Sequence, residues 1–210
     1  SEISLHKSSI PFINAFKQDK QILIAGSTWP KDEEILYTVF QQKGFENIKL
    51  VIAPHEINKV NLASIRSLFK GAVFYSELND EELVSQARYL VIDNVGMLSR
   101  LYQYGDVTYV GGGFSIDGIH NILEAATWGK PVLFGPNHSK FKEAENLIKA
   151  GGGKSFCNKD QLKAFLQEYF SDEISYKKAS EAAQSFIKEN KGATEKIIGY
   201  IQENRLLTNL

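Results

Sequence analysis

The segment from residue 106 to residue 136 constrains the fold more strongly than any other part of the 210-residue chain. Residues 107–110 (V-T-Y-V) are mostly the β-branched and aromatic types that favour a buried strand. Three glycines follow at 111–113, where the backbone must turn sharply or lie close to a ligand. A second apolar run at 132–134 (V-L-F) indicates another buried strand. The segment therefore predicts a parallel strand-helix-strand unit.

The connection between these strands is predicted to be a helix that begins near Gly118 and ends at Gly129. One apolar stripe is expected from residues at i, i+3, i+4 and i+7, namely Ile119, Ile122, Leu123 and Ala126. The opposite face would carry three polar side chains: His120, Asn121 and Glu124. Free N–H groups, a helix dipole and these side chains would then surround one cavity. Such a cavity suits an anion with hydroxyl groups, such as a nucleotide phosphate with its ribose.

Apolar runs alternate with amphipathic segments along the rest of the chain. Strands are expected at 22–25, 49–53, 72–75, 89–92 and 155–157. Helices are expected at about 30–43, 58–69, 98–102, 140–150, 158–170, 174–189 and 194–204, with Asn158 as an N-cap. This alternation predicts an α/β fold, a Rossmann-like parallel sheet with helices on both faces. Residues 21–210 are expected to form one domain, preceded by a lead-in segment at 1–20.

Turns with small or polar residues follow four of the expected strands. They lie at 26–28 (G-S-T), 54–55 (P-H), 93–96 (D-N-V-G) and 111–113 (G-G-G). In parallel sheets, ligands bind beyond the carboxyl ends of the strands. Because all four turns follow the carboxyl ends of strands, the sequence predicts a single ligand cleft at that edge of the sheet.

Composition narrows the classes of function. A formal net charge of −1 gives no reason to expect nucleic acid as a partner. The single cysteine, Cys157, cannot form an internal disulfide and fits a reducing compartment. No apolar run has the length of a membrane span, and no group of His, Cys and Asp has the spacing of a metal site. The chain opens with Ser1 rather than Met, as expected for a processed terminus or a piece of a longer protein.

Each candidate site residue also has a purely structural interpretation. The glycines match neither a P-loop nor a G-x-G-x-x-G fingerprint, so they serve either packing or phosphate binding. Glu124 is either a solvated carboxylate or an acceptor for ribose hydroxyls. The same choice between structure and anion binding applies to four other side chains: Ser27, Thr28, His55 and His120. The two tryptophans, Trp29 and Trp128, are expected to be packing residues.

Four short motifs together resemble the donor-binding half of 3-deoxy-D-manno-octulosonic acid (Kdo) transferases. They are G-G-G-F at 111–114, G-I-H-N-I-L-E-A-A at 118–126, P-V at 131–132 and G-P-N at 135–137. The turns at 26–28 and 93–96 also fall where this family has A-S-T and D-T-x-G-E-L segments. The resemblance covers most of the chain between about residues 20 and 150.

The resemblance implies a two-lobed glycosyltransferase of the GT-B type. Its carboxyl-terminal lobe binds CMP-Kdo, and its amino-terminal lobe binds the lipid A precursor and carries the catalytic carboxylate. This chain would be the carboxyl-terminal lobe alone, soluble, without a catalytic residue and inactive by itself. The full protein would act in lipopolysaccharide biosynthesis as a peripheral protein at the cytoplasmic face of the bacterial inner membrane.

The resemblance also assigns roles within an inverting transfer that needs no metal or cofactor. Backbone N–H groups at 112–113 and at the helix start near Gly118 would stabilise the leaving phosphate. Glu124 would hold the ribose beside Asn121, and Met97 and its neighbours would border the cytosine. The complete predicted donor site is Ser27, Thr28, His55, Gly96, Met97, Gly111, Gly112, Gly113, His120, Asn121 and Glu124.

This chain departs from the family pattern at two turns. The family has R-H-P-E-R after the second strand, where this chain has P-H-E-I-N at 54–58 and lacks both arginines. Either another residue such as His55 or Lys59 would supply the anion contact, or that contact would be missing. In the D-T-x-G-E-L segment, Asn94 replaces Thr and Met97 replaces Glu. Three alternatives therefore remain: another GT-B glycosyltransferase, a UDP-sugar epimerase, or a stand-alone nucleotide-sugar-binding module.

Overall fold

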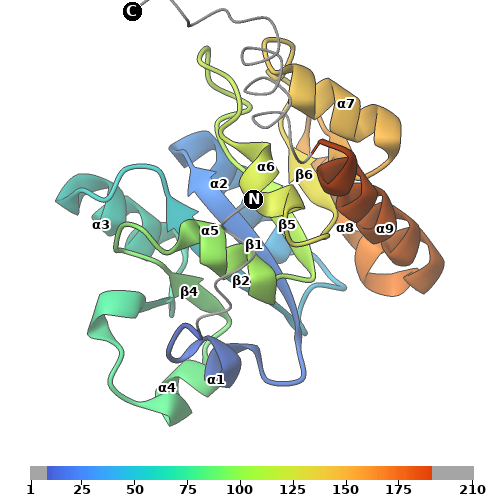
Figure 1. Cartoon of the computed structure of the whole chain (residues 1–210). Coiled ribbons are helices and arrows are strands. Elements are labelled where there is room, and N and C mark those ends of the chain that lie inside the picture. Colours follow the sequence, from blue (N-terminus) through green and yellow to red (C-terminus); the bar gives the residue numbers. More distant parts are fainter. Residues whose placement is uncertain (1–8, 191–210) are drawn as a thin grey trace, which may run out of the picture.

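The computed structural model describes residues 9–190, which form one sheet between two layers of helices (Figure 1). Within these residues all seven strands are parallel, in the order β3-β4-β2-β1-β5-β6-β7. The strands are β1 (Gln21–Thr28), β2 (Ile48–Pro54), β3 (Val73–Phe74), β4 (Tyr89–Val91), β5 (Val107–Val110), β6 (Val132–Phe134) and β7 (Gly153–Ser155). The α/β class and the parallel sheet predicted from the sequence are confirmed.

Helices bury both faces of this sheet. One layer contains α2 (Pro30–Phe40), α3 (Lys59–Leu68) and α8 (Lys159–Ser171). The other contains α1 (Ile13–Lys17), α4 (Glu81–Gln86), α5 (Leu98–Leu101), α6 (Ile122–Ala126) and α7 (Lys142–Ala150). Helix α9 (Glu173–Asn190) makes most of its apolar contacts with this second layer. Along β1, Ile22 and Ile24 pack under one layer, while Leu23 and Ala25 pack under the other. Burial on both faces explains why the strands read as continuous apolar runs.

The strand order reverses at β1, which places a ligand-binding edge there. From β1 the chain continues to β2 on one side, and it later returns to β5 on the other side. Gly26 of β1 consequently lies beside Ala53 of β2 and Val110 of β5. In open parallel sheets the crevice beyond such a reversal is the usual ligand site. The turns after β1, β2, β4 and β5 meet at this edge.

Most expected elements occur close to their predicted bounds, but one strand is shifted, one helix is additional and one expected turn is absent. The last strand lies at 153–155 rather than 155–157. Helix α4 was not expected, and it begins where the Asp80 side chain accepts a hydrogen bond from the Glu82 amide. Residues 26–28 are not an exit turn, because β1 continues through them with a register shift. Ser27 absorbs that shift with a φ of 51°, in the left-handed region. The helix expected at 194–204 lies outside the described residues.

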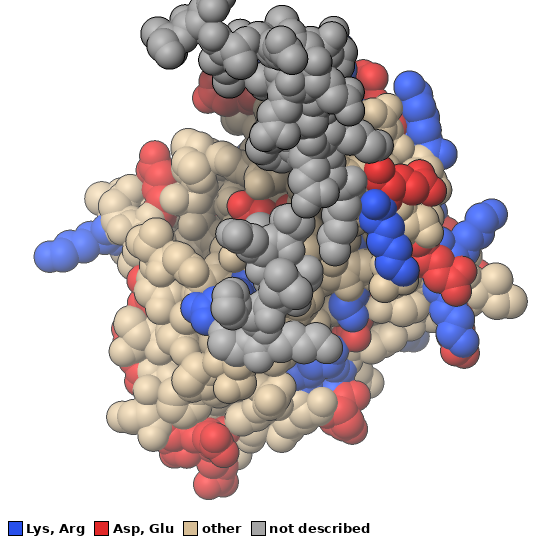
Figure 2. All heavy atoms as spheres, viewed as in Figure 1, with Lys and Arg blue, Asp and Glu red and all other residues tan. Residues whose placement is uncertain are grey.

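Charged side chains of both signs are interspersed over the side formed by α7, α8 and α9 (Figure 2). Acidic side chains gather at the end of the molecule formed by α4, whose first turn carries Glu81 and Glu82. Within residues 9–190, no helix combines the length and apolar content that crossing a membrane requires. In the same residues, no three His, Cys, Asp or Glu side chains lie close enough together to hold a metal ion.

Candidate functional site

The glycines after β5 are required by close backbone packing at the edge of the sheet. A Cβ atom on Gly111 would lie 2.2 Å from the Ser27 carbonyl oxygen, and one on Gly113 would lie 2.5 Å from the Gly135 Cα. Gly112 adopts a φ of 90°, which side chains rarely tolerate. The packing interpretation of the three glycines therefore holds, and it brings the turn directly against the end of β1.

The buried carboxylate of Asp32, in the first turn of α2, holds the glycine turn in place. Its side chain accepts hydrogen bonds from the Gly112 amide (3.0 Å), the Trp29 amide (2.9 Å) and the Tyr109 hydroxyl (2.5 Å). Burial raises the pKa of Asp32, although these three donors act in the opposite direction. The Gly112 N–H is therefore already used and is not free for a phosphate, contrary to its expected role. Gly113 is also buried, and its N–H has no hydrogen-bond partner among the described residues.

Three aromatic rings stack beside the glycine turn. His55, directly after β2, lies 4.2 Å from the His120 ring and 4.8 Å from the Trp29 ring, measured between ring centroids. The Trp29 indole N–H donates to His120 Nε2 at 2.9 Å. The sequence predicts Trp29 as a packing residue only, and this contact adds a polar role. The two histidines, which lie far apart in the sequence, are brought together as expected of a single site.

The Trp29 contact determines the protonation state of His120. An indole N–H can only donate, so His120 Nε2 must carry a lone pair and the neutral ring must hold its proton on Nδ1. Partial burial lowers the pKa of His120, and the neighbouring His55 lowers it further, against a weaker opposite effect of Asp117. His120 is consequently a neutral hydrogen-bond donor through Nδ1, rather than a cation, at neutral pH.

Removal of the indole donor is expected to raise the pKa of His120. Trp29→Phe keeps a ring in the stack but deletes the hydrogen bond to the neutral imidazole, so protonation becomes easier. Imidazole ¹⁵N shifts followed against pH should show the increase. Trp128→Phe is the matched control, because that indole donates instead to the Ser99 carbonyl. An unchanged His120 titration in Trp29→Phe would contradict the assigned tautomer.

The helix that carries Glu124 begins later than the sequence predicts. Gly118 has a φ of 88° and is not at a helix start, and the amides of Ile119 and His120 bind the carbonyls of Asn137 and Gly111. These bonds hold the backbone out of a helix until Asn121, which caps α6 through the Leu123 amide. His120 therefore lies outside the helix. Leu123 is 37% exposed, so it is not part of a buried stripe.

Asn121 and Glu124 nevertheless lie together, as predicted. The Asn121 carboxamide N–H donates to Glu124 Oε1 at 3.1 Å. Burial is the main cause that raises the pKa of the Tyr102 hydroxyl, and the negative charge of Glu124 adds to it. Tyr102 in turn packs on Gly26, where an added Cβ would lie 2.1 Å from the hydroxyl oxygen. The half-buried Glu124 carboxylate is thus placed toward the end of β1.

The hydroxyl of Thr28 is used inside the protein. Thr28 is 1% exposed, and its Oγ1 donates to Glu33 Oε1 at 3.0 Å. Burial raises the pKa of Glu33 to about 7, and the adjacent Asp32 contributes in the same direction. Glu33 is therefore partly protonated at neutral pH, which a helix-start carboxylate in solvent would not be. The structure does not bring the Thr28 hydroxyl to the open edge of the sheet, whereas Ser27 lies there.

A cavity of about 350 Å³ opens at the ends of β1, β2 and β4. It contains three of the predicted site residues: Ser27, His55 and Gly96. Met97 does not line it, because its side chain packs partly into the core and only its neighbours Gly96 and Leu98 reach the cavity. The remaining lining is mostly apolar: Ala53, Pro54, Ile57, Ile92 and Val95, with the polar Asn94.

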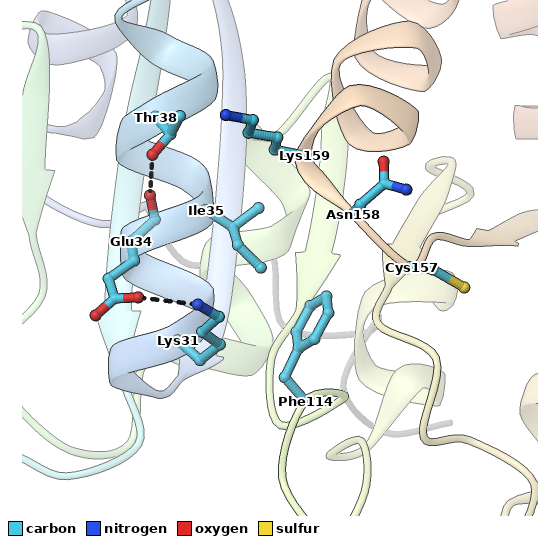
Figure 3. Close-up of a pocket in the computed structure, with 8 residues that line it drawn as sticks. All are labelled: Lys31, Glu34, Ile35, Thr38, Phe114, Cys157, Asn158 and Lys159. Atoms are coloured by element: carbon cyan, nitrogen blue, oxygen red, sulfur yellow. Dashed lines mark hydrogen bonds and ion pairs between the residues drawn. The ribbon is translucent and has the colours of Figure 1, made fainter.

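A second cavity, of about 420 Å³, lies between α2 and the start of α8 (Figure 3). Figure 3 shows Ile35 and Phe114 at its centre and Cys157 at its rim. Lys31 forms an ion pair with Glu34 at 3.2 Å. None of the predicted site residues lines this cavity. It is larger than the cavity at β1, β2 and β4, but neither the three stacked rings nor the three glycines line it.

Three residues that contact the candidate site escape sequence reasoning: Trp29, Asp32 and Glu33. Asp32 and Glu33 read as ordinary acidic residues in the first turn of a helix, where they complement the helix dipole. The signal for Asp32 is its position three residues after the N-cap, from which a carboxylate reaches back to the N-cap amide. No comparable local signal marks Trp29, since its partner His120 is distant in sequence.

Comparison with known proteins identifies relatives among glycosyltransferases. A bifunctional glycosyltransferase/methyltransferase of Fusobacterium nucleatum is 28% identical over 193 residues, which are 90% of this chain and 27% of that protein. A Kdo transferase of Chlamydophila psittaci is 33% identical over 139 residues, which are 65% of this chain and 31% of that protein. Further Kdo transferases match at similar identity, and this chain spans less than half the length of each. No protein-family model matches the chain.

The fold of the chain also matches a solved structure of a nucleotide-sugar-binding domain. The C-terminal CMP-Kdo binding domain of WaaA from Acinetobacter baumannii superposes with a TM-score of 0.70 at 16% sequence identity. The match covers 83% of this chain and 92% of that domain. At this identity the likeness establishes the fold, which is that of one lobe of a GT-B glycosyltransferase.

Proposed function

We propose, from the premise that this chain is a GT-B glycosyltransferase lobe homologous to the Kdo transferases, that it binds CMP-Kdo as a sugar donor. One observation carries the proposal. At the edge where the strand order reverses, a tight glycine turn, two stacked histidines and the Asn121–Glu124 pair are held together. A nucleotide phosphate and its ribose need this combination of donors and a carboxylate.

The proposed roles follow from the free groups at this edge. The Gly113 N–H and the Nδ1–H of His120 donate to the phosphate, and His55 adds a third polar group in place of the missing arginines. These donors stabilise the negative charge on the departing CMP, because they are fixed before the reaction begins. Glu124 accepts the ribose hydroxyls, and Asn121 holds its carboxylate in place.

The proposed reaction is an inverting transfer of Kdo to a lipid A precursor. A base deprotonates a sugar hydroxyl of the acceptor, and the hydroxyl oxygen forms a bond to the anomeric carbon of Kdo. The bond from that carbon to the phosphate oxygen breaks, and CMP leaves with the electron pair. We assign the base to a part of the protein beyond this chain, as we do the contact with the cytoplasmic face of the inner membrane. The isolated chain is therefore expected to bind the donor without transferring it.

A second candidate is a GT-B glycosyltransferase with another nucleotide sugar. The Fusobacterium nucleatum glycosyltransferase, which matches 90% of this chain, leaves this candidate open because its name specifies no donor. The nucleotide decides between the two candidates, since a Kdo donor carries CMP and most other donors carry UDP or GDP.

Calorimetric titration of the chain with CMP, with UDP in parallel, tests the proposal. CMP is expected to bind more tightly than UDP. Glu124→Ala should weaken CMP binding about tenfold, because two ribose hydroxyls lose a charged acceptor. Glu181→Ala, on the exposed side of α9, serves as the control and should change nothing. Tighter binding of UDP would favour the second candidate, and unchanged CMP affinity in Glu124→Ala would remove Glu124 from the site.

A further inference from the structure

An unsatisfied polar atom belongs to a residue that lines the cavity at the ends of β1, β2 and β4. The carboxamide oxygen of Asn94 is shielded from solvent and has no hydrogen-bond partner. Asn94 itself lines the cavity. A shielded acceptor without a donor is unfavourable, so such atoms are rare unless a ligand or an ordered water supplies the missing hydrogen bond.

The loop that carries Asn94 is held firmly in place. The preceding residue, Asp93, accepts hydrogen bonds from the Ser76 amide at 2.8 Å and from the Ser76 hydroxyl at 2.5 Å. On the strand side, the Ile92 amide donates to the Ile52 carbonyl at 2.8 Å. The backbone that leads into Asn94 is therefore held in place at the mouth of the cavity.

The remaining lining suits a flat, largely apolar group. Ala53, Pro54, Ile57, Ile92, Val95 and Leu98 surround the cavity with apolar atoms. Ser27 and His55 connect it to the glycine turn and to the ring stack. A nucleotide whose phosphate lies at that turn can therefore extend its base into this cavity.

We propose that Asn94 selects the base of the bound nucleotide, by accepting a hydrogen bond from the exocyclic amine of a cytosine. The inference rests on the function proposed above. Cytosine carries an N–H donor at the position where uracil carries a carbonyl oxygen. An acceptor oxygen at this position therefore favours cytosine and disfavours uracil, because it would pair with the amine of cytosine and face the carbonyl oxygen of uracil. Asn94 is thus a specificity-determining residue for cytosine over uracil.

The test is the ratio of the CMP and UMP dissociation constants, measured by calorimetry on the whole chain. The unmodified chain is expected to bind CMP at least about tenfold more tightly than UMP. Asn94→Leu removes the acceptor and should bring the ratio close to one, mainly through weaker CMP binding. Asn94→Asp keeps an acceptor oxygen, so it should retain the preference even if its charge weakens both nucleotides. Asn146→Ala, on the exposed side of α7, is the control.

The outcomes separate this inference from the proposed function. If the chain binds CMP and Asn94→Leu keeps the original ratio, the base assignment is wrong and the donor site stands. If the unmodified chain prefers UMP, the acceptor does not read an amine, and the inference fails. If neither nucleotide binds, the proposed function fails together with this inference. Asn94→Ala replaces Asn94→Leu if the larger side chain does not fold into the cavity.

Discussion

Asp32→Ala is expected to lower the free energy of unfolding by about 4 kcal/mol, because it leaves two buried donors without an acceptor. The Tyr109 side chain is 0% exposed and donates its hydroxyl to Asp32, and the Gly112 amide does the same from the glycine turn. Both donors belong to buried residues, so the protein around them offers no ready replacement for the carboxylate. Urea unfolding monitored by circular dichroism gives the value.

The neighbouring acid at position 34 provides a control for Asp32. Glu34 lies on the same helix but is exposed and paired only with Lys31, so Glu34→Ala should change the stability by no more than about 0.5 kcal/mol. Tyr109→Phe removes the donor rather than the acceptor and should cost only about 1 kcal/mol. A loss below about 1 kcal/mol in Asp32→Ala would show that Asp32 does not hold the glycine turn.

Glu33→Gln is expected to remove a pH dependence of stability worth up to about 3 kcal/mol. The pKa of Glu33 is raised from 4.5 to about 7 by burial, so the folded protein holds a proton that the unfolded chain releases. Stability from this group is complete below pH 4.5 and is lost as the pH rises toward and through 7. Glutamine stays neutral and can still accept from the Thr28 hydroxyl, so the variant should gain stability over the parent protein at pH 8.

Urea unfolding at pH 5 and at pH 8 measures this effect. The difference in stability between the two pH values should be smaller in Glu33→Gln than in the parent protein. Glu34→Gln, at an exposed position, should follow the parent protein. Parallel pH profiles for Glu33→Gln and the parent protein would mean that Glu33 is ionised in the folded state.

The sequence predicts the architecture well because its strongest signals are local. Continuous apolar runs of the kind seen at β1 and β2 indicate strands buried on both faces. Asn158 was predicted as an N-cap, and its side chain accepts from the amides of Asp160 and Gln161 at the start of α8. The turns at the carboxyl ends of the strands likewise meet at one edge, since parallel strands must end there together.

The details of the site depend on contacts between distant residues, which local patterns do not contain. The helix expected from Gly118 starts only at Ile122, because a carbonyl from Asn137 and one from Gly111 capture the intervening amides. The Gly112 N–H is taken by Asp32, which lies 80 residues earlier in the chain. Spacing along a helix cannot reveal either contact.

The three stacked rings are another feature of the candidate site that local sequence patterns do not reveal. Taken singly in the sequence, each histidine favours a structural interpretation over a role in anion binding. Their 4.2 Å stacking and the Trp29 hydrogen bond to His120 become visible only once β1, β2 and β5 are side by side. Folding thus turns three separate and ambiguous residues into one polar cluster at the ligand edge.

The most direct test of the nucleotide site is a titration of ¹⁵N-labelled chain with CMP, followed by two-dimensional NMR. The amide signals of Asn94, Gly113, His120 and Glu124 are expected to move together and to saturate at one concentration. Signals from Thr38 and Lys159, in the cavity between α2 and α8, should stay in place. Shifts confined to that second cavity, or no shifts at millimolar CMP, would contradict a nucleotide site at the ends of β1, β4 and β5.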